Sequence, residues 1–178
     1  MHVLHFSCAG TMQHNDRDDG NVYGPASPTH LTHPEQVTVM TLWCMMRAPL
    51  FFGGRVPLDN GDTWTLDLLT NAEVLAVHNA SDRTRVVNAT SGSGSHYAFA
   101  ADATSDVADV TYLAIFNTGD VRNNVTLPVA SIGITASPQY CARDLWAHAA
   151  VAGTWTSADI FTLPVDGHGA AILAWRAC

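Results

Sequence analysis

The pattern of hydrophobic and polar positions changes near residue 80. Before that point apolar residues recur at the spacing of helices, and after it they alternate with polar residues in short runs. Helical spacing predicts elements that bury one side, whereas alternation predicts strands with one buried face. We therefore divide the chain into residues 1–80, a mixture of helix and loop, and residues 81–178, which are built of strands.

The first expected helix covers residues 32–48. Thr32 and Glu35 have the spacing of a capping box, and Pro34 stands in the first turn, where its missing N–H costs nothing. Pro49 then disfavours helical geometry in the residue before it. Apolar side chains lie on several sides of this helix rather than in one stripe. We expect it to be covered on two sides.

Shorter elements are expected to follow. Residues 48–54 read as an apolar strand with a glycine turn, residues 62–71 as a second helix, and residues 74–77 as a strand. The loop-forming composition of residues 14–30 precedes them. Helix and strand in alternation are typical of the closing stretch of an α/β barrel.

The last part of the chain reads as seven or eight short strands separated by Gly, Asn, Asp, Ser and Pro. Its clearest alternating sets are Tyr97/Phe99/Ala101, Val125/Leu127/Val129 and Phe161/Leu163/Val165. Short strands at this density predict an antiparallel β-sandwich. We interpret "SGSGS" (residues 91–95) as a hairpin tip, with an interdomain linker as the alternative.

The charge of the chain argues against some classes of binding partner. The formal net charge is −8, charged residues are 13% of the chain, and all 8 basic residues are arginine. No basic cluster is present, which argues against nucleic acid and against an anionic membrane as partners. No apolar run reaches the roughly 20 residues that span a bilayer.

The cysteines and histidines predict neither a metal site nor a cofactor. The four cysteines have no C-x-x-C spacing, which argues against a zinc ribbon and against a redox pair. Cys44 is expected to be a buried thiol, and a disulfide between Cys141 and Cys178 is left open. The nine histidines do not converge, and no phosphate-binding glycine loop occurs.

Three Asn-x-Ser/Thr sequons occur, at Asn79, Asn88 and Asn124. Each is a candidate for N-glycosylation, a modification of secreted proteins. They point weakly to a secreted or lysosome-like compartment.

Two stretches, "LTHPEQVTVMTLWCMMRAPLFFGG" (residues 31–54) and "DLLTNAEVLAV" (residues 67–77), carry a resemblance. They resemble the end of the catalytic barrel in the α-galactosidase family, glycoside hydrolase family twenty-seven. The later segments "AIFNTGD", "RDLW" and "HGAAIL" resemble that family's C-terminal sandwich more loosely. The resemblance implies a mainly β fold, in which an antiparallel sandwich (residues 81–178) follows the last α/β elements of a (β/α)8 barrel (residues 1–80).

The family's retaining mechanism uses two aspartates, one in a K-x-D motif and one in an R-x-x-x-D motif. Their carboxyls stand about 5 Å apart across the scissile bond. This chain has no lysine, so K-x-D is absent, and its one R-x-x-x-D, from Arg55 to Asp59, follows the closing helix. The resemblance therefore implies no catalytic residue in this chain.

One motif of the family's active-site loops has a partial counterpart. Asn15, Asp16 and Asp18 match part of W-N-D-P-D-M-L, although His14 replaces the tryptophan. Asp16 and Asp18 are therefore candidate substrate-proximal residues, and the alternative is a solvated acidic turn. A calcium-binding EF-hand fails, because Arg17 stands where an acidic ligand is needed.

The function expected from the resemblance is that of the C-terminal region of an α-galactosidase-like glycoside hydrolase, which is inactive alone. Its implied partner is a galactoside once a barrel is completed. The helix over residues 32–48 would then pack on the missing barrel. Without that barrel, its free face would pack on residues 1–14, associate with a second chain or stand exposed. The alternative function is a free-standing sandwich that binds sugars or proteins, with Trp64, Trp155 or Trp175 stacking on sugar rings.

Overall fold

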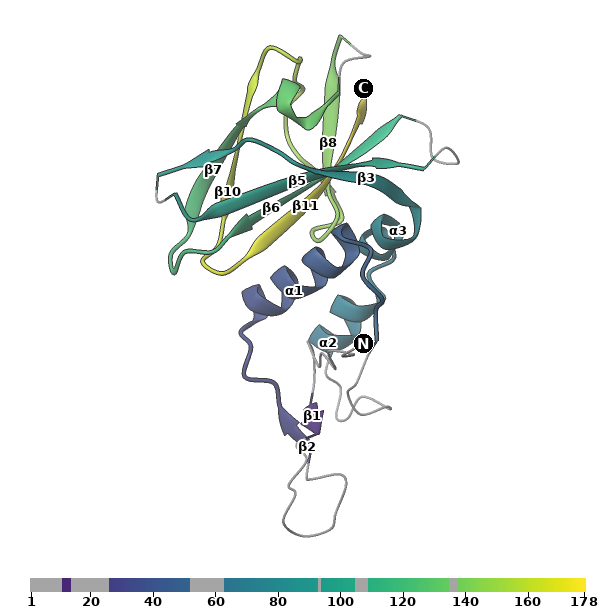
Figure 1. Ribbon diagram of the computed structural model, residues 1–178, viewed down its shortest axis with the longest axis vertical. Helices are drawn as coiled ribbons and strands as arrows, with labels where there is room; N and C mark the ends of the chain where they lie inside the picture. Colours follow the sequence, from purple (N-terminus) through teal and green to yellow (C-terminus); the bar gives the residue numbers. More distant parts are fainter. Residues whose placement is uncertain (1–10, 14–25, 52–62, 93, 105–108, 135–137) are drawn as a thin grey trace.

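A computed structural model describes residues 11–13, 26–51, 63–92, 94–104, 109–134 and 138–178 (Figure 1). The helices are α1 (His33–Met45), α2 (Thr63–Thr70) and α3 (Ala72–Ala80), and Val129–Ile132 form a 3₁₀ turn. The strands are β1 (Thr11–Gln13), β2 (Ala26–Pro28), β3 (Ser81–Val86), β4 (Thr90–Ser91), β5 (His96–Ala103), β6 (Val110–Asn117), β7 (Asn123–Pro128), β8 (Tyr140–Asp144), β9 (Ala149–Ala150), β10 (Ile160–Val165) and β11 (Ala170–Ala177). No helix within these ranges has the length and apolar character needed to cross a bilayer.

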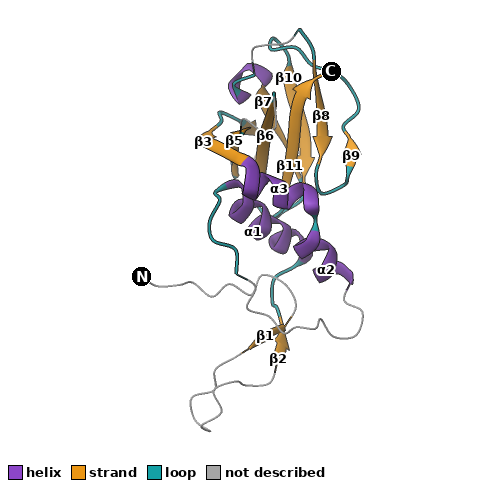
Figure 2. Cartoon of the chain, turned by 90° about the vertical axis from the view of Figure 1, so that its right-hand side faces the viewer, coloured by secondary structure: helices purple, strands orange, loops and turns teal. Residues whose placement is uncertain are grey.

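The strands confirm the predicted antiparallel sandwich. Six strands form one sheet in the order β3-β5-β6-β11-β8-β9, and three form a second sheet in the order β10-β7-β4. Neighbouring strands in both sheets run antiparallel. Strands β1 and β2 pair only with each other and lie beyond the helices, on the side away from the sandwich (Figures 1 and 2).

The six-stranded sheet is covered on both faces. Leu113 and Ala114 are adjacent on β6 and both are fully buried, but Leu113 packs toward the three-stranded sheet and Ala114 toward the helices. Trp175 and Ile172 on β11 divide between the same two cores. The molecule therefore has three layers, with the helices together beneath the large sheet (Figure 2).

Helix α1 begins as predicted. The Thr32 side chain accepts from the backbone N–H of Glu35, and Glu35 Oε2 accepts from the backbone N–H of Thr32 at 2.7 Å. The bonds that the Thr32 backbone N–H and hydroxyl donate to the Glu35 carboxylate hold the pKa of Glu35 below its ordinary value. Met40, Cys44 and Met45 are buried against the sheet, which confirms the buried thiol. The described residues cover only this side of the helix.

Residues 74–77 form helix α3 and not the predicted strand. Asn71 caps the helix, because its Oδ1 accepts from the backbone N–H groups of Glu73 and Val74 at 3.0 and 3.1 Å. Val74 and Val77, three positions apart, are then buried on one side. A short apolar run does not distinguish helix from strand by its periodicity, and the capping residue decides here. Helix α2, by contrast, lies where the sequence predicts it.

The predicted strand over residues 48–54 is wrong in its described part. Residues 48–51 form no strand, and residues 52–54 lie outside the described ranges. In a strand, the backbone carbonyls would accept hydrogen bonds from a neighbouring strand. Here side chains bond to them instead: Trp43 Nε1 donates to Pro49 O at 2.9 Å, and His78 Nε2 lies 2.9 Å from Ala48 O.

The segment "SGSGS" (residues 91–95) is also not a hairpin tip. Strand β4 before it pairs with β7, and strand β5 after it pairs with β3 and β6. The segment therefore carries the chain from the three-stranded sheet to the six-stranded sheet.

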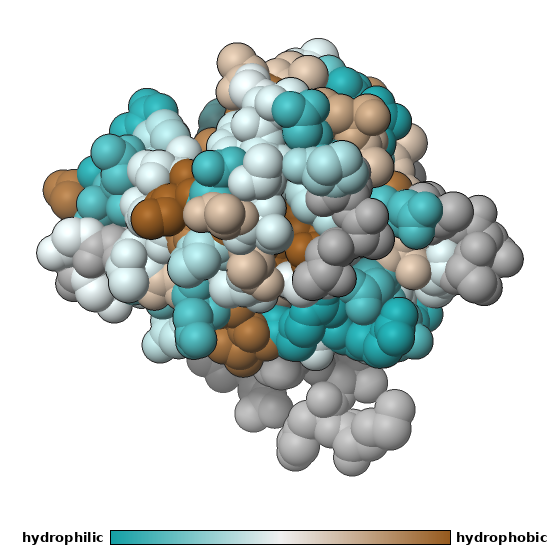
Figure 3. Space-filling view, turned by 90° about the horizontal axis from the view of Figure 1, so that it is seen from above, coloured by the Kyte–Doolittle hydropathy of each residue, from teal (hydrophilic) through white to brown (hydrophobic). Residues whose placement is uncertain are grey.

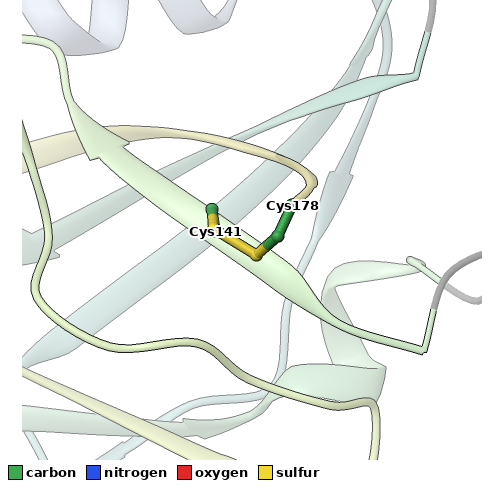
Figure 4. Close-up of a disulfide and its surroundings, with 2 residues drawn as sticks. All are labelled: Cys141 and Cys178. Carbon is green, nitrogen blue, oxygen red and sulfur yellow. A yellow bond between two sulfur atoms is a disulfide. The ribbon is translucent and has the colours of Figure 1, made fainter.

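A disulfide joins Cys141 on β8 to Cys178, the residue after β11 (Figure 4). The two strands are neighbours in the sheet, and Cys141 is paired with Arg176. The disulfide therefore links the residue after β11 to the neighbouring strand β8, near the β9 edge of the large sheet. Disulfides persist in oxidising compartments, and the compartment of this protein stays a prediction.

Replacing Asn71 with alanine should destabilise the protein by about 1–3 kcal/mol, because the change removes a helix cap and leaves a buried carbonyl without its donor. Asn71 Nδ2 donates to Leu145 O at 3.0 Å in addition to capping α3. Urea unfolding followed by circular dichroism measures the loss. Asn79→Ala, on the exposed end of the same helix, is the control and should change stability little. Equal effects of the two changes would contradict the role given to Asn71.

Candidate functional site

The structure describes some, but not all, of the residues that the sequence predicts to be functional. Asp16 and Asp18 lie outside the described residues, so their role near substrate stays a prediction. Asn79 is the second-last residue of α3, Asn88 lies between β3 and β4, and Asn124 lies on β7. All three are exposed, and their glycosylation also stays a prediction. Within the described ranges, no three His, Cys, Asp or Glu side chains gather as metal ligands would.

Polar side chains converge where α3 meets β8. Arg143 Nε and Nη2 donate to the two carboxylate oxygens of Glu73 at 2.7 and 2.8 Å. His148 Nδ1 lies 2.7 Å from Glu73 Oε1. The Arg143 hydrogen bonds, aided by His148 and opposed by burial, lower the pKa of Glu73 to about 2. The same pair raises the pKa of Arg143, so this junction is charged at neutral pH.

Two buried polar residues on α1 hold tryptophans from other elements. Gln36 Oε1 accepts from Trp64 Nε1 on α2 at 3.1 Å, and Thr41 Oγ1 accepts from Trp146 Nε1 after β8 at 2.9 Å. Gln36 is only 4% exposed and Thr41 is fully buried. This role was not predicted from the sequence. The available signal was the presence of polar residues such as Gln36 and Thr41 within a largely apolar helix, because buried polar groups require partners.

These bonds connect the segments that carried the family resemblance. "RDLW" supplies Arg143, which binds Glu73 of "DLLTNAEVLAV", and Trp146, which binds Thr41 of the first stretch. "HGAAIL" begins with His168, whose Nε2 lies 3.0 Å from Asp120 Oδ1 at the end of "AIFNTGD". Thr38 Oγ1 of the first stretch donates to His168 O at 2.6 Å, so all five segments belong to one bonded region across the layers.

A cavity of about 480 Å³ lies beside this region, between α2 and the turn from β8 to β9. Trp64 and Trp146 form apolar walls, and Asp67, Thr70 and His148 supply polar groups. Aromatic walls with a few polar groups are typical of small-molecule sites.

The helical side of the molecule also exposes large apolar side chains. Leu42 and Met46 lie one turn apart on α1 and are 39% and 40% exposed. Phe51 is 68% exposed and Leu66 on α2 is 49% exposed. We call these four residues the apolar helical face. Seen from the sandwich end, by comparison, brown hydrophobic patches interrupt a largely hydrophilic surface (Figure 3).

Comparison with known proteins identifies the sandwich. Residues 103–174 match the family model of the α-galactosidase C-terminal β-sandwich domain. The sandwich of this chain is similar to the C-terminal β-sandwich domain of α-galactosidase-like glycoside hydrolases. The order in which helices precede this sandwich also matches the C-terminal portion of solved members of glycoside hydrolase family twenty-seven.

Relatives resemble the chain beyond the sandwich. α-Galactosidase D of Emericella nidulans is 28% identical over 78% of the chain, and α-galactosidase 2 of Arabidopsis thaliana is 29% identical over 66% of it. A family twenty-seven β-L-arabinopyranosidase of Geobacillus stearothermophilus has 28% identity and a TM-score of 0.78 over 97% of the chain. A variant of that enzyme was solved in complex with arabinose.

The chain spans only part of these proteins. It covers 20% of the Emericella protein, 28% of the Arabidopsis protein and 36% of the Geobacillus protein. The greater part of each relative has no counterpart in this chain.

Glu73→Gln should make the stability of the protein less dependent on pH in the acid range. The folded pKa of Glu73 is about 2, below the ordinary 4.5, so its ionised form stabilises the fold above pH 4.5. That contribution is lost as the pH falls from 4.5 toward about 2. Urea unfolding between pH 7 and pH 2 should therefore show the variant less stable at neutral pH, with the difference shrinking on acidification.

Asp67→Asn is the control, because Asp67 makes no ion pair with a described residue. A difference between wild type and Glu73→Gln that stays constant from pH 7 to pH 2 would show that the Glu73 carboxylate is not the stabilising group.

Proposed function

We propose that this chain is the C-terminal region of an α-galactosidase-like glycoside hydrolase, and that it serves O-glycoside hydrolysis only when a barrel carrying both catalytic aspartates is joined to it. The observation that carries the proposal is the extent of the structural match. It covers 97% of the chain, so it includes the helices as well as the sandwich. A module that was only a sandwich would match over residues 81–178 alone.

The chemistry of the sequence supports inactivity of the chain alone. The family's nucleophile follows a lysine two positions earlier, and the chain contains no lysine. Arg55 and Asp59 have the spacing of the family's acid/base motif but lie between α1 and α2, in the closing segment. A retaining hydrolase needs two carboxyls about 5 Å apart, and the proposal places both of them on the barrel.

The exposed apolar helical face supports the proposal that another part of the enzyme covers these helices. Leu42, Met46, Phe51 and Leu66 lie on the helical side, whereas the sandwich lies against the opposite side of α1. A large exposed apolar surface generally marks an interface. In the proposed enzyme the barrel covers this face, and the polar bonds at Glu73 and Thr41 keep the helices on the sandwich.

The second candidate function is a module that binds sugars by itself. Of the three tryptophans that could stack on a sugar, two are unsuited to this role. Trp175 is fully buried, and Trp155 packs edge to face on Phe161 with its ring centroid 5.3 Å away. Both belong to the sandwich core and are unsuited to stacking on a sugar. Trp64, by contrast, borders two cavities.

The purified chain should not release nitrophenol from aryl α-galactosides, aryl α-N-acetylgalactosaminides or aryl β-L-arabinopyranosides. The expected rate equals that of buffer, because the proposed catalytic carboxyls are absent from the chain. A full-length family member assayed in parallel is the positive control. Turnover by the chain that persists in the Asp16→Asn/Asp18→Asn double variant would contradict the proposal.

The isolated chain should associate with itself through the apolar helical face. Leu42→Glu/Leu66→Glu should shift the sedimentation profile toward the monomer, because the charges oppose burial of that face. Val121→Glu/Ile160→Glu is the matched control, since these residues are 68% and 67% exposed on the sandwich. Equal effects of the two double variants would contradict the assignment of the interface.

A further inference from the structure

We propose that the cavity between α2 and the turn from β8 to β9 binds a pyranose ring of a carbohydrate without acting on it chemically. The site is built by Trp64 and Asp67 of α2 with Trp146 and His148 of the turn. It goes beyond the proposed function, because it needs neither the barrel nor a catalytic carboxylate.

The two indole rings are held in place before any ligand arrives. Each indole N–H donates to a buried side chain of α1, Trp64 to Gln36 and Trp146 to Thr41. Gln36 is fixed in turn, because its Nε2 donates to Leu31 O at 2.9 Å. Rings fixed in this way lose little conformational entropy on binding, which favours affinity for a rigid ligand.

One face of Trp64 is already occupied. The His33 ring stacks on it with centroids 3.9 Å apart and planes inclined by 12°. His33 lines a second, smaller cavity of about 270 Å³, which Trp64 also borders, but it does not line the first cavity. The Trp64 face opposite His33 is therefore the one that the larger cavity presents to a ligand.

Three polar groups at the cavity have unused bonding capacity. Asp67 is exposed and makes no hydrogen bond or ion pair within the described part of the chain. Thr70 Oγ1 donates to Leu66 O at 2.7 Å and keeps its acceptor lone pairs. His148 uses Nδ1 toward Glu73, which leaves Nε2 for a ligand. Asn71 also lines the cavity, but its amide is committed to Leu145 and α3.

This combination of groups fits a pyranose. The ring of such a sugar has an apolar C–H face, which suits an indole, and an edge of hydroxyls, which suits a carboxylate, a hydroxyl and an imidazole. No arginine lines the cavity within the described ranges, and Asp67 is an anion, so phosphorylated ligands are disfavoured. The volume of about 480 Å³ lies in the usual range for small ligands.

The cavity lies on a different side of α2 from the apolar helical face. Trp64 and Leu66 are two residues apart, so their side chains point about 200° apart around the helix. Asp67, three residues after Trp64, lies on the Trp64 side. A barrel that packs on Leu66 therefore does not have to fill the sugar site.

Indole N–H resonances of the ¹⁵N-labelled chain provide the test. Titration with methyl α-D-galactopyranoside and with arabinose should shift the Trp64 and Trp146 signals in a saturable manner. The Trp155 and Trp175 signals, from the sandwich core, should stay in place. Sorbitol, an acyclic polyol, should cause no saturable shift, because it has no ring face to stack.

Asp67→Ala should weaken binding about tenfold, as expected for loss of a charge-assisted hydrogen bond. Asp82→Ala, which removes an exposed aspartate of β3 that does not line the cavity, is the matched control and should bind like wild type. Trp64→Ala should abolish binding, with the dispersion of the other amide signals showing that the fold persists.

The inference is overturned if neither sugar shifts Trp64 and Trp146, if sorbitol shifts them equally, or if the two aspartate variants bind alike. None of these results depends on hydrolysis. Absence of sugar binding would leave the proposed role beside a barrel intact, and turnover by the isolated chain would leave the binding result intact.

Discussion

The fold depends on excluding water from both faces of the six-stranded sheet. Strand β6, near the middle of this sheet, has buried side chains on both of its faces. Leu113 points to one core and Ala114 to the other, and both are fully buried. A sandwich of two sheets buries only one face of each sheet. The helices therefore supply the cover that the second face requires, and they belong to the same folding unit as the strands.

Hydrogen bonds and an ion pair fix the position of the helices on the six-stranded sheet. The bidentate pair of Arg143 with Glu73, the bond from Asn71 to Leu145 O and the bond from Trp146 to Thr41 all connect a helix to β8 or to the turn after it. Burial of apolar surface is non-directional, whereas these bonds have fixed geometry. They bring Trp146 next to α2, and so create the cavity. They also leave one side of the helices uncovered for a partner.

Much of this could be predicted from local sequence. The capping box of α1 and the alternation of β7 and β10 depend on neighbouring residues, and both were confirmed. Helix α3 was misread, because a run of four apolar residues fits either period and the decisive cap, Asn71, was taken as the end of the preceding helix. The hydrogen-bond partners of Gln36 and Thr41 could not be predicted from the sequence, since each residue binds a tryptophan that is distant along the chain. The Cys141–Cys178 pairing was left open for the same reason.

Native-state hydrogen exchange tests the central claim, that helices and sandwich share one structure. Amides of α1 and α3 should exchange with the same free energy of opening as those of β6 and β11, because removing the helices exposes an apolar sheet face. Exchange of the helical amides at much lower free energy, while β6 and β11 stay protected, would show that the sandwich is stable without the helices and would contradict the account.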